Sequence, residues 1–261
     1  MSKLNNSAIN MITQILWLLK KTIDSRLVTS FVLSLSLTVT TTAVAKYNPP
    51  PDQRPPGGYT TSSGSRGVCG VSGGTPLTVL APQRHVGQTT STHPTFAWFV
   101  PDSKPLPMEF ILYKYSPGSA PKLVHKIELR SSPGIMNLTL PEDKPDLTVG
   151  QRYLWQVAIL CNSNHPSSDL VARAEIEVVQ VPPALKRALA TKNRLEMADL
   201  YAEAGLWYDA LREALEPAKD ARLGEVASSL LEDLAELEKP KATQIESRQS
   251  ANLRQIASSQ R

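Results

Sequence analysis

Short runs of alternating apolar and polar residues, separated by prolines and glycines, fill the middle of the chain. In one of them, Ala174, Ile176 and Val178 alternate with charged side chains. Similar runs occur at residues 77–80, 95–100, 109–115, 123–129, 135–140 and 152–161. Alternation with a period of two is the pattern of a strand with one buried face, and many short strands separated by turns are typical of a sandwich. The sequence therefore predicts about seven strands in a β-sandwich domain over residues 68–181.

One of these runs carries a corner of known geometry. Residues 147–157 resemble the approach to the sixth strand of immunoglobulin and fibronectin type III domains, in which a tyrosine hydroxyl binds the loop backbone. Tyr153 stands at that position, and Trp155 and Cys161 share its face by the period of two. The resemblance implies an immunoglobulin/fibronectin-III-like sandwich with Cys161 at the end of its core.

The apolar spacing changes to three and four residues after Pro182 and Pro183, which predicts a helical region over residues 182–239. We expect helices at 185–204, 206–218 and 222–237. Residues 198–211 are similar to the two-helix unit of a tetratricopeptide repeat, with Gly205 at its turn. One such unit cannot form a solenoid, so this hairpin should pack on the β domain or on a partner.

Three aromatic residues of this hairpin, Tyr201, Trp207 and Tyr208, are the candidate partner-binding residues. Trp207 and Tyr208 are adjacent, so their side chains point about 100° apart on a helix and a narrow core face cannot hold both. A wide apolar stripe would instead bury both of them.

The first 45 residues have the features of an export signal. Basic residues precede an apolar run at 27–39, which ends in small residues before Ala45. This order is typical of a cleavable signal peptide, and the run is shorter than the roughly 20 residues that span a bilayer. We expect cleavage after Ala45, with a retained membrane anchor as the alternative, and a periplasmic or extracellular location with no membrane span after cleavage.

Two polar segments flank the expected domains. Residues 46–67 are rich in Pro, Gly and Ser and predict a flexible or extended leader outside the core. Residues 240–261 are polar and basic, with one acidic residue, and predict a mobile or weakly helical tail.

The net charge of the exported part is small. The whole chain has 28 Lys and Arg against 24 Asp and Glu, and residues 1–45 contain four of the former and one of the latter. The remainder, at about +1, has no electrostatic attraction for nucleic acid. We expect a protein or another envelope component as the partner.

The two cysteines, Cys69 and Cys161, lie in the part that would be exported to an oxidising compartment. An even pair in such a compartment predicts a disulfide bond. Two separate buried thiols are the alternative.

The order of motifs along the chain resembles a family of exported, mostly cyanobacterial proteins known as domain of unknown function 928. The motifs include Ser65-Arg66-Gly67-Val68-Cys69, His93-Pro94-Thr95-Phe96-Ala97-Trp98, Gly150-Gln151-Arg152-Tyr153-Leu154-Trp155 and Gly205-Leu206-Trp207-Tyr208-Asp209-Ala210-Leu211. The resemblance implies an envelope or secreted location, pairing of the two cysteines, and a β domain followed by helices. It implies no catalytic residues.

Several residues match fragments of catalytic or metal-binding patterns. Ser72 lies in a Gly-x-Ser-x-Gly sequence, but that nucleophile motif requires a strand-to-helix turn in an α/β sheet, and a strand is expected to follow it here. The acidic loop at residues 142–146 lacks the regular oxygen-donor spacing of a calcium loop. The four histidines form no zinc pattern.

We therefore expect a non-catalytic binding module without a cofactor, in which the helical hairpin is the contact surface. A hydrolase that uses Ser72 or the acidic loop is the alternative from another class. A structural protein of the cell surface is the third.

Overall fold

The runs with period two form strands in a computed structural model, which describes residues 46–51, 55–57, 74–101, 104–115, 120–162, 164–190, 192–215, 223–239 and 247–261. The strands in these ranges are β1 (Thr78–Val79), β2 (Gly87–Thr89), β3 (Thr95–Val100), β4 (Pro107–Tyr115), β5 (Lys122–Arg130), β6 (Gly134–Thr139), β7 (Arg152–Ile159) and β8 (Leu170–Val178). A short 3-10 helix, η1 (Pro166–Ser168), precedes β8. Each of the seven expected runs contains a strand.

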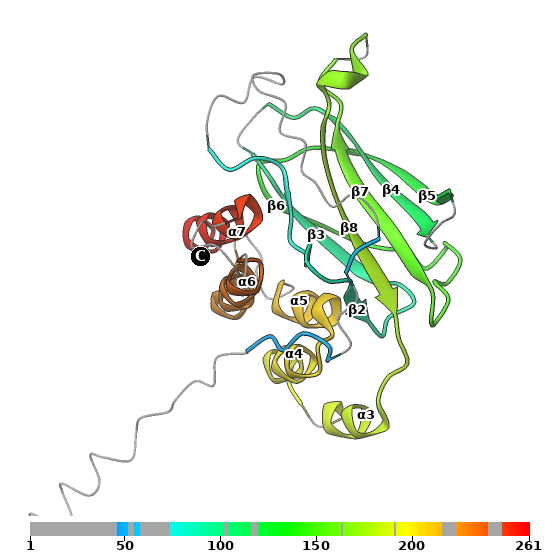
Figure 1. Ribbon diagram of the computed structural model, residues 1–261, viewed down its shortest axis with the longest axis vertical. Helices are drawn as coiled ribbons and strands as arrows, with labels where there is room; N and C mark the ends of the chain where they lie inside the picture. Colours follow the sequence, from blue (N-terminus) through cyan, green and yellow to red (C-terminus); the bar gives the residue numbers. More distant parts are fainter. Residues whose placement is uncertain are drawn as a thin grey trace, which may run out of the picture. The chain divides into compact units, whose positions relative to one another are not determined.

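The strands form two sheets, visible in Figure 1. The first has the order β1-β3-β6, and the second has the order β2-β8-β7-β4-β5. All neighbouring pairs are antiparallel except β2 and β8, which run parallel. Strand β2 was not expected from the sequence, because its three residues, Gly-Gln-Thr, show no apolar alternation.

Large aromatic side chains fill the space between the sheets. Phe96 of β3 lies 4.9 Å from Phe110 of β4 and 5.1 Å from Trp155 of β7, measured between ring centroids. Trp98 and Trp155 are fully buried. Burial of this apolar area, worth about 25 cal/mol per Å², is the main force that holds the two sheets together.

The corner before β7 has the predicted hydrogen bond. The Thr148 N–H donates to the Tyr153 hydroxyl at 2.9 Å, and Gly150 adopts a φ of +81° within the turn. This bond links the loop to the first residues of β7 and keeps Tyr153 and Trp155 on the inner face.

Five helices follow the strands in the described ranges: α3 (Pro183–Leu189), α4 (Arg194–Glu203), α5 (Trp207–Leu215), α6 (Glu225–Leu237) and α7 (Arg248–Ser259). The expected helix at 185–204 is therefore two helices. Asn193 begins α4 with a capping box, in which its side chain accepts from the Glu196 N–H and the Glu196 carboxylate accepts from the Asn193 N–H. This cap favours a new helix start over continuation of the first helix.

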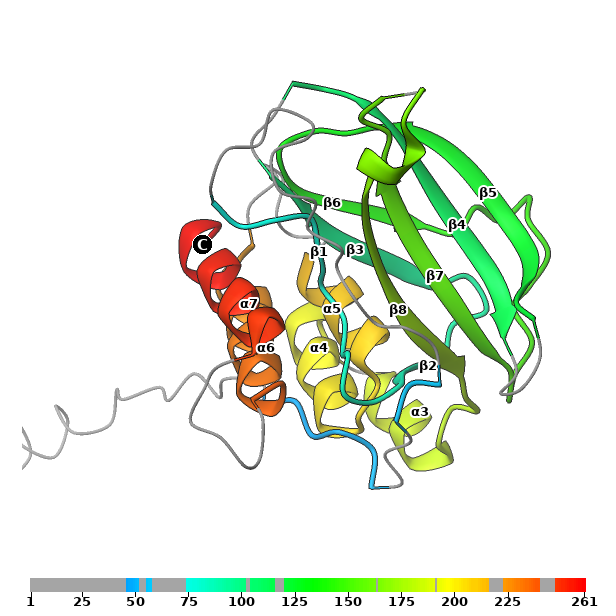
Figure 2. The same cartoon turned by 45° about the horizontal axis from the view of Figure 1, so that its top comes forward.

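The helices pack beside the sheets, with α4 and α5 as an antiparallel pair joined by Gly205 at a φ of +78° (Figure 2). Among them, α5 contacts β2 and β3, and α7 contacts β1. The structure therefore has mixed β and α content, with two sheets and a helical layer.

The C-terminal segment differs from the mobile or weakly helical tail that we expected. Its described residues, 247–261, contain α7, whose Leu253 and Ile256 are fully buried against the rest of the core. The Gln249 side chain donates to the Val79 carbonyl at 3.1 Å, beside the edge strand β1. Tertiary packing thus stabilises a helix whose polar composition predicts little helical structure.

The N-terminal segment also differs from expectation in part. Residues 46–51, named here the N-terminal strap, pack on the helices, and Tyr47 belongs to the core with 2% of its surface exposed. The expected signal peptide at 1–45 lies outside the described residues. Within the described ranges, each helix is too short or too polar to cross a lipid bilayer.

Candidate functional site

The best-defined group of polar and aromatic side chains lies where α5 meets the two sheets. We name it the joint, and it comprises the side chains of Tyr47, His85, Trp207, Tyr208 and Asp209. The Tyr208 ring lies 6.0 Å from Phe96 in one sheet and 6.4 Å from Trp155 in the other. Tyr208 therefore enters the space between the sheets.

Hydrogen bonds fix both aromatic side chains of α5. The Trp207 Nε1–H donates to the Leu80 carbonyl at 2.9 Å. The Tyr208 hydroxyl accepts from Trp155 Nε1–H at 2.8 Å and donates to the Glu175 carbonyl at 3.0 Å. Because each polar atom of these two side chains has a buried partner, neither carries an unsatisfied group into the core.

The three aromatic residues proposed as partner-binding residues are buried. Tyr201 is 9% exposed, Trp207 is fully buried, and Tyr208 is 1% exposed. The expectation that one of them lies on the surface is wrong, because α5 is enclosed by α4, α6 and the sheets and buries almost its whole circumference. In the folded protein Trp207 and Tyr208 join α5 to the β part of the molecule, and Tyr201 is a buried residue of α4.

Tyr47 and His85 extend the joint toward the strap. Their side chains form a hydrogen bond of 2.8 Å between Tyr47 Oη and His85 Nε2, and the Tyr47 ring packs edge-on against Trp207 at 4.9 Å. Burial lowers the pKa of His85 to about 4. The imidazole is therefore neutral at pH 7, as a buried histidine without an acidic partner should be.

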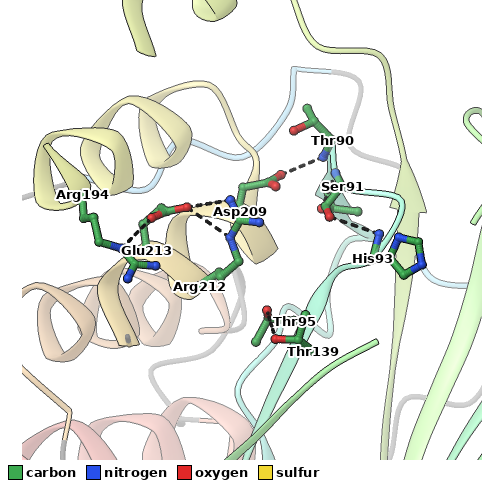
Figure 3. Close-up of polar contacts among 10 residues, drawn as sticks. Thr90, Ser91, His93, Thr95, Thr139, Arg194, Asp209, Arg212 and Glu213 are labelled. Atoms are coloured by element: carbon green, nitrogen blue, oxygen red, sulfur yellow. Dashed lines mark hydrogen bonds and ion pairs between the residues drawn. The ribbon is translucent and has the colours of Figure 1, made fainter. Parts of the chain in front are cut away.

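Two carboxylates of α5 lie in the same region, as Figure 3 shows. The Asp209 carboxylate accepts from the Thr90 N–H at 2.7 Å, and Glu213 pairs with Arg212 at 2.6 Å and Arg194 at 3.1 Å. Burial raises the pKa of Asp209 to about 6, and the hydrogen bond from the Thr90 backbone partly opposes this increase. Both groups are thus engaged in holding α5 against the β2–β3 loop and against α4.

The same kind of contact recurs on α6. Glu238, just after α6, accepts from the backbone N–H groups of Gln83 and Arg84 at 2.8 and 3.1 Å, and Asp233 accepts from the Tyr47 N–H at 3.0 Å. These contacts were not expected from the sequence. Their only signal was the excess of acidic over basic residues in the helical region.

The acidic loop between β6 and β7 is held by a histidine while its carboxylates face solvent. His93 lies 3.1 Å from the Lys144 carbonyl oxygen and 3.6 Å from the Asp146 carboxylate. The side chains of Asp143 and Asp146 are each 72% exposed. The Ser91 hydroxyl accepts from the His93 backbone N–H at 3.1 Å, as Figure 3 shows.

The candidate nucleophile and one of the two cysteines lie outside the described residues. These are Ser72 and Cys69, so the nucleophile alternative and the cysteine pairing stay predictions. Cys161 is half-buried just after β7, and its N–H donates to the Asp169 carboxylate at 2.9 Å. In the described ranges, no three His, Cys, Asp or Glu side chains gather in a metal-binding arrangement.

A groove of about 740 Å³ lies between α6 and α7. Its lining consists of Glu232, Asp233, Glu236, Arg254, Gln255 and Ser258. Glu236 forms ion pairs with Lys239 and Arg254, and Glu232 pairs with Arg261 at 3.5 Å. The groove is lined by polar and charged residues of both signs, whose aliphatic parts also contribute to its surface.

Among known proteins, the chain matches one family. No curated protein and no solved structure matches the chain. The family described as Domain of Unknown Function (DUF928) matches residues 61–245, which is about seven-tenths of the chain and includes both sheets and most of the helical layer. The chain therefore belongs to the DUF928 family.

Proposed function

We propose that this protein is an exported, non-catalytic binding module of the cell envelope or the extracellular space. Export is supported by the basic and apolar pattern of residues 1–45 and by the resemblance to exported proteins. A disulfide bond between Cys69 and Cys161 is part of the proposal, since both cysteines would reach an oxidising compartment.

We further propose that the β part is an immunoglobulin/fibronectin-III-like sandwich. The strand orders β1-β3-β6 and β2-β8-β7-β4-β5 support it, because the chain passes repeatedly from one sheet to the other, as in such folds. The Tyr153 hydroxyl bound to the Thr148 N–H is the second support. The hairpin of α4 and α5, with Gly205 between them, supports a unit of the tetratricopeptide type.

One observation carries the functional proposal. Three titratable side chains in or beside the joint have structural partners. Asp209 accepts from a backbone N–H, Glu213 pairs with two arginines, and His85 bonds to Tyr47. A catalytic acid or base needs access to the proton that it transfers, and Asp209, Glu213 and His85 are only 2%, 4% and 3% exposed. These groups therefore serve the attachment of the helices.

The contact surface should lie on the outer side of the helical layer, since its aromatic residues face inward. The groove between α6 and α7 is the concave part of this side, and it offers carboxylates, an arginine and an amide to a partner. We assign the partner contact to this groove.

A steric block in the groove tests this assignment. Ser258→Trp places a large side chain among the lining residues without changing a buried group, and Ser167→Trp makes the same change at an exposed position of η1. Cross-linking in the native envelope, followed by mass spectrometry, should recover partners with wild type and with the Ser167 variant, but not with the Ser258 variant. Equal recovery by all three proteins would place the contact on another surface.

A further inference from the structure

The N-terminal strap is attached to the folded domain through the side chain of Tyr47. That side chain is 2% exposed, bonds to His85 at 2.8 Å and packs against Trp207 at 4.9 Å. A buried aromatic residue of this kind typically contributes several kcal/mol to stability, on the order of 3 to 5. Residue 47 is therefore part of the domain core.

The backbone of the strap is held as well. The Tyr47 N–H donates to the Asp233 carboxylate at 3.0 Å, and the Asn48 N–H donates to the Ala202 carbonyl at 3.0 Å. Beyond it, Pro50 is buried close to Gly205, the turn of the α4–α5 hairpin. The strap thus contacts both the α4–α5 pair and α6.

The signal cleavage that we expect from the sequence falls between Ala45 and Lys46, one residue before Tyr47. Cleavage after Ala45 would replace the amide of Lys46 by an α-ammonium group. Consecutive backbone nitrogens lie within about 3.6 Å of each other, and the Tyr47 nitrogen lies 3.0 Å from Asp233. The new ammonium would therefore lie within about 7 Å of this carboxylate by chain geometry alone.

Asp233 is suited to receive a cation. On α6, Glu232 pairs with Arg261. Glu236 pairs with Lys239 and Arg254. In contrast, no side-chain cation of the described residues lies within ion-pair distance of Asp233. The charged groups that act on it are Lys46, Glu232 and Glu236, and Arg254 of α7 lines the same groove. Burial and the two neighbouring glutamates raise the pKa of Asp233. A nearby ammonium group would oppose this increase because it favours the charged carboxylate.

We propose that residues 46–47 form a processed amino terminus that completes the fold, in which the α-ammonium of Lys46 pairs with Asp233 while Tyr47 occupies the core. This proposal rests on the proposed export. It also limits the processing site, because cleavage on the C-terminal side of Tyr47 would remove a core side chain. Processing must therefore occur before this residue.

Proteins with defined first residues test the proposal. We would compare forms that begin at Lys46, at Ala43 and at Asn48, each in the wild-type and the Asp233→Asn background, at low ionic strength. At pH 7 the Lys46 form should melt about 2 °C above the Ala43 form, since its terminal charge lies beside Asp233. This difference should vanish above about pH 9, where an α-amino group with a pKa near 8 is neutral, and in the Asp233→Asn background.

The Asn48 form lacks Tyr47 and should melt at least about 6 °C below the Lys46 form. Equal melting temperatures of the Lys46 and Ala43 forms, or a difference that persists in Asp233→Asn, would overturn the ion pair. Equal stability of the Asn48 form would overturn the anchoring role of Tyr47. Sequencing the amino terminus of the natural protein tests cleavage separately. A start at Met1 contradicts cleavage and favours the retained membrane anchor, whereas the stability comparison does not depend on this result.

Discussion

At the scale of the residue, Tyr208 shows how one hydroxyl group connects three elements. It accepts from Trp155 of β7 and donates to the Glu175 carbonyl of β8, while its own backbone is part of α5. Burial raises the pKa of Tyr208 far above its usual value, so the phenol stays protonated and can donate. Loss of this hydroxyl would leave the buried Trp155 N–H without this acceptor.

We predict that Tyr208→Phe destabilises the protein by about 1 to 3 kcal/mol, because the cost of an unsatisfied buried donor is added to the lost hydrogen bond. Urea denaturation monitored by tryptophan fluorescence measures this difference. The control is Tyr113→Phe at a half-buried position of β4, which should change stability by less than about 0.5 kcal/mol. Equal effects of the two changes would refute the role given to the Tyr208 hydroxyl.

Asp209 and His85 have opposite effects on the pH dependence of stability. The pKa of Asp209 is raised from 3.8 to about 6, so its contribution is greatest below pH 4 and is lost as the pH rises through 6. The pKa of His85 is lowered from 6.5 to about 4, so its contribution is complete above pH 6.5 and is lost as the pH falls through 4. Each shift corresponds to about 3 kcal/mol, and the two nearly cancel between pH 4 and 6.5.

Asp209→Asn should remove the contribution of Asp209 to the pH dependence of stability and leave that of His85. The carboxamide oxygen of this variant would still accept from the Thr90 N–H, whereas the charged form and its burial cost would be absent. We predict that the free energy of unfolding of this variant falls by about 3 kcal/mol between pH 6.5 and 4, while that of wild type changes little. Denaturation curves at several pH values check this, with Asp143→Asn on the exposed loop as the control. Parallel curves for wild type and Asp209→Asn would contradict the prediction.

At the scale of the element, the turn of the α4–α5 hairpin is linked to the strap. Gly205 has a φ of +78°, and a Cβ atom built there would lie 3.0 Å from the Asn48 carbonyl oxygen and from the Pro50 nitrogen. Gly150 has a similar φ of +81°, with no atom within 4 Å of its Cβ position. Substitution of each glycine by alanine therefore distinguishes the effect of backbone strain, present at both positions, from the effect of contact with the strap, present only at Gly205.

We predict that Gly205→Ala destabilises the protein more than Gly150→Ala does. The Gly150 variant should lose about 1 kcal/mol from the strained φ alone, and the Gly205 variant should lose at least about 1 kcal/mol more because the strap must move. Thermal melting of the two variants measures the difference. A loss at Gly205 no greater than that at Gly150 would show that the strap does not press on this turn.

At the scale of the whole molecule, the helices and the sheets share one core. Tyr208 contacts aromatic rings of both sheets, and Gln249 of α7 binds the backbone of β1. The sequence predicted a β domain and a helical region as two successive parts of the chain. The shared core instead indicates that removal of the helices would expose the inner side chains of the sandwich.

We predict that residues 46–181 alone do not fold cooperatively. The missing helices contact β1, β2 and β3 and cover the core between them. Loss of a large buried aromatic residue by itself typically costs about 3 to 5 kcal/mol. Circular dichroism with thermal denaturation checks this. A sharp unfolding transition of the 46–181 fragment would show that the two parts are independent domains.

We also predict one disulfide bond between Cys69 and Cys161. In the chain-entropy model, closure of a loop of roughly 90 residues stabilises a fold by about 4 to 5 kcal/mol. Peptide mapping of unreduced protein recovered from its native compartment should show the linked pair. Alkylation of both thiols without prior reduction would exclude it.

The sequence by itself determined the local structure of most of the molecule. Each predicted strand run contains a strand because alternation allows one face to be buried, and residues after Pro183 form helices because their apolar spacing matches the helical repeat. The predicted hydrogen bond of Tyr153 forms because its two partners are only five residues apart. These features depend on neighbours in the chain.

Only the tertiary structure decided which polar and aromatic side chains meet. The joint brings Tyr47, His85 and Trp207 together although they lie far apart in the sequence, and their periodicity does not reveal which face of one element packs on another. For the same reason, the sequence allowed Tyr201, Trp207 and Tyr208 to be interpreted as a surface. The polar side of α5, with Asp209, Arg212 and Glu213, predicts exposure to solvent, whereas in the fold Asp209 and Glu213 are buried against partners from other elements. The buried strap and α7 follow this rule too: their polar composition favours exposure, and the few apolar side chains that they insert into the core determine their position.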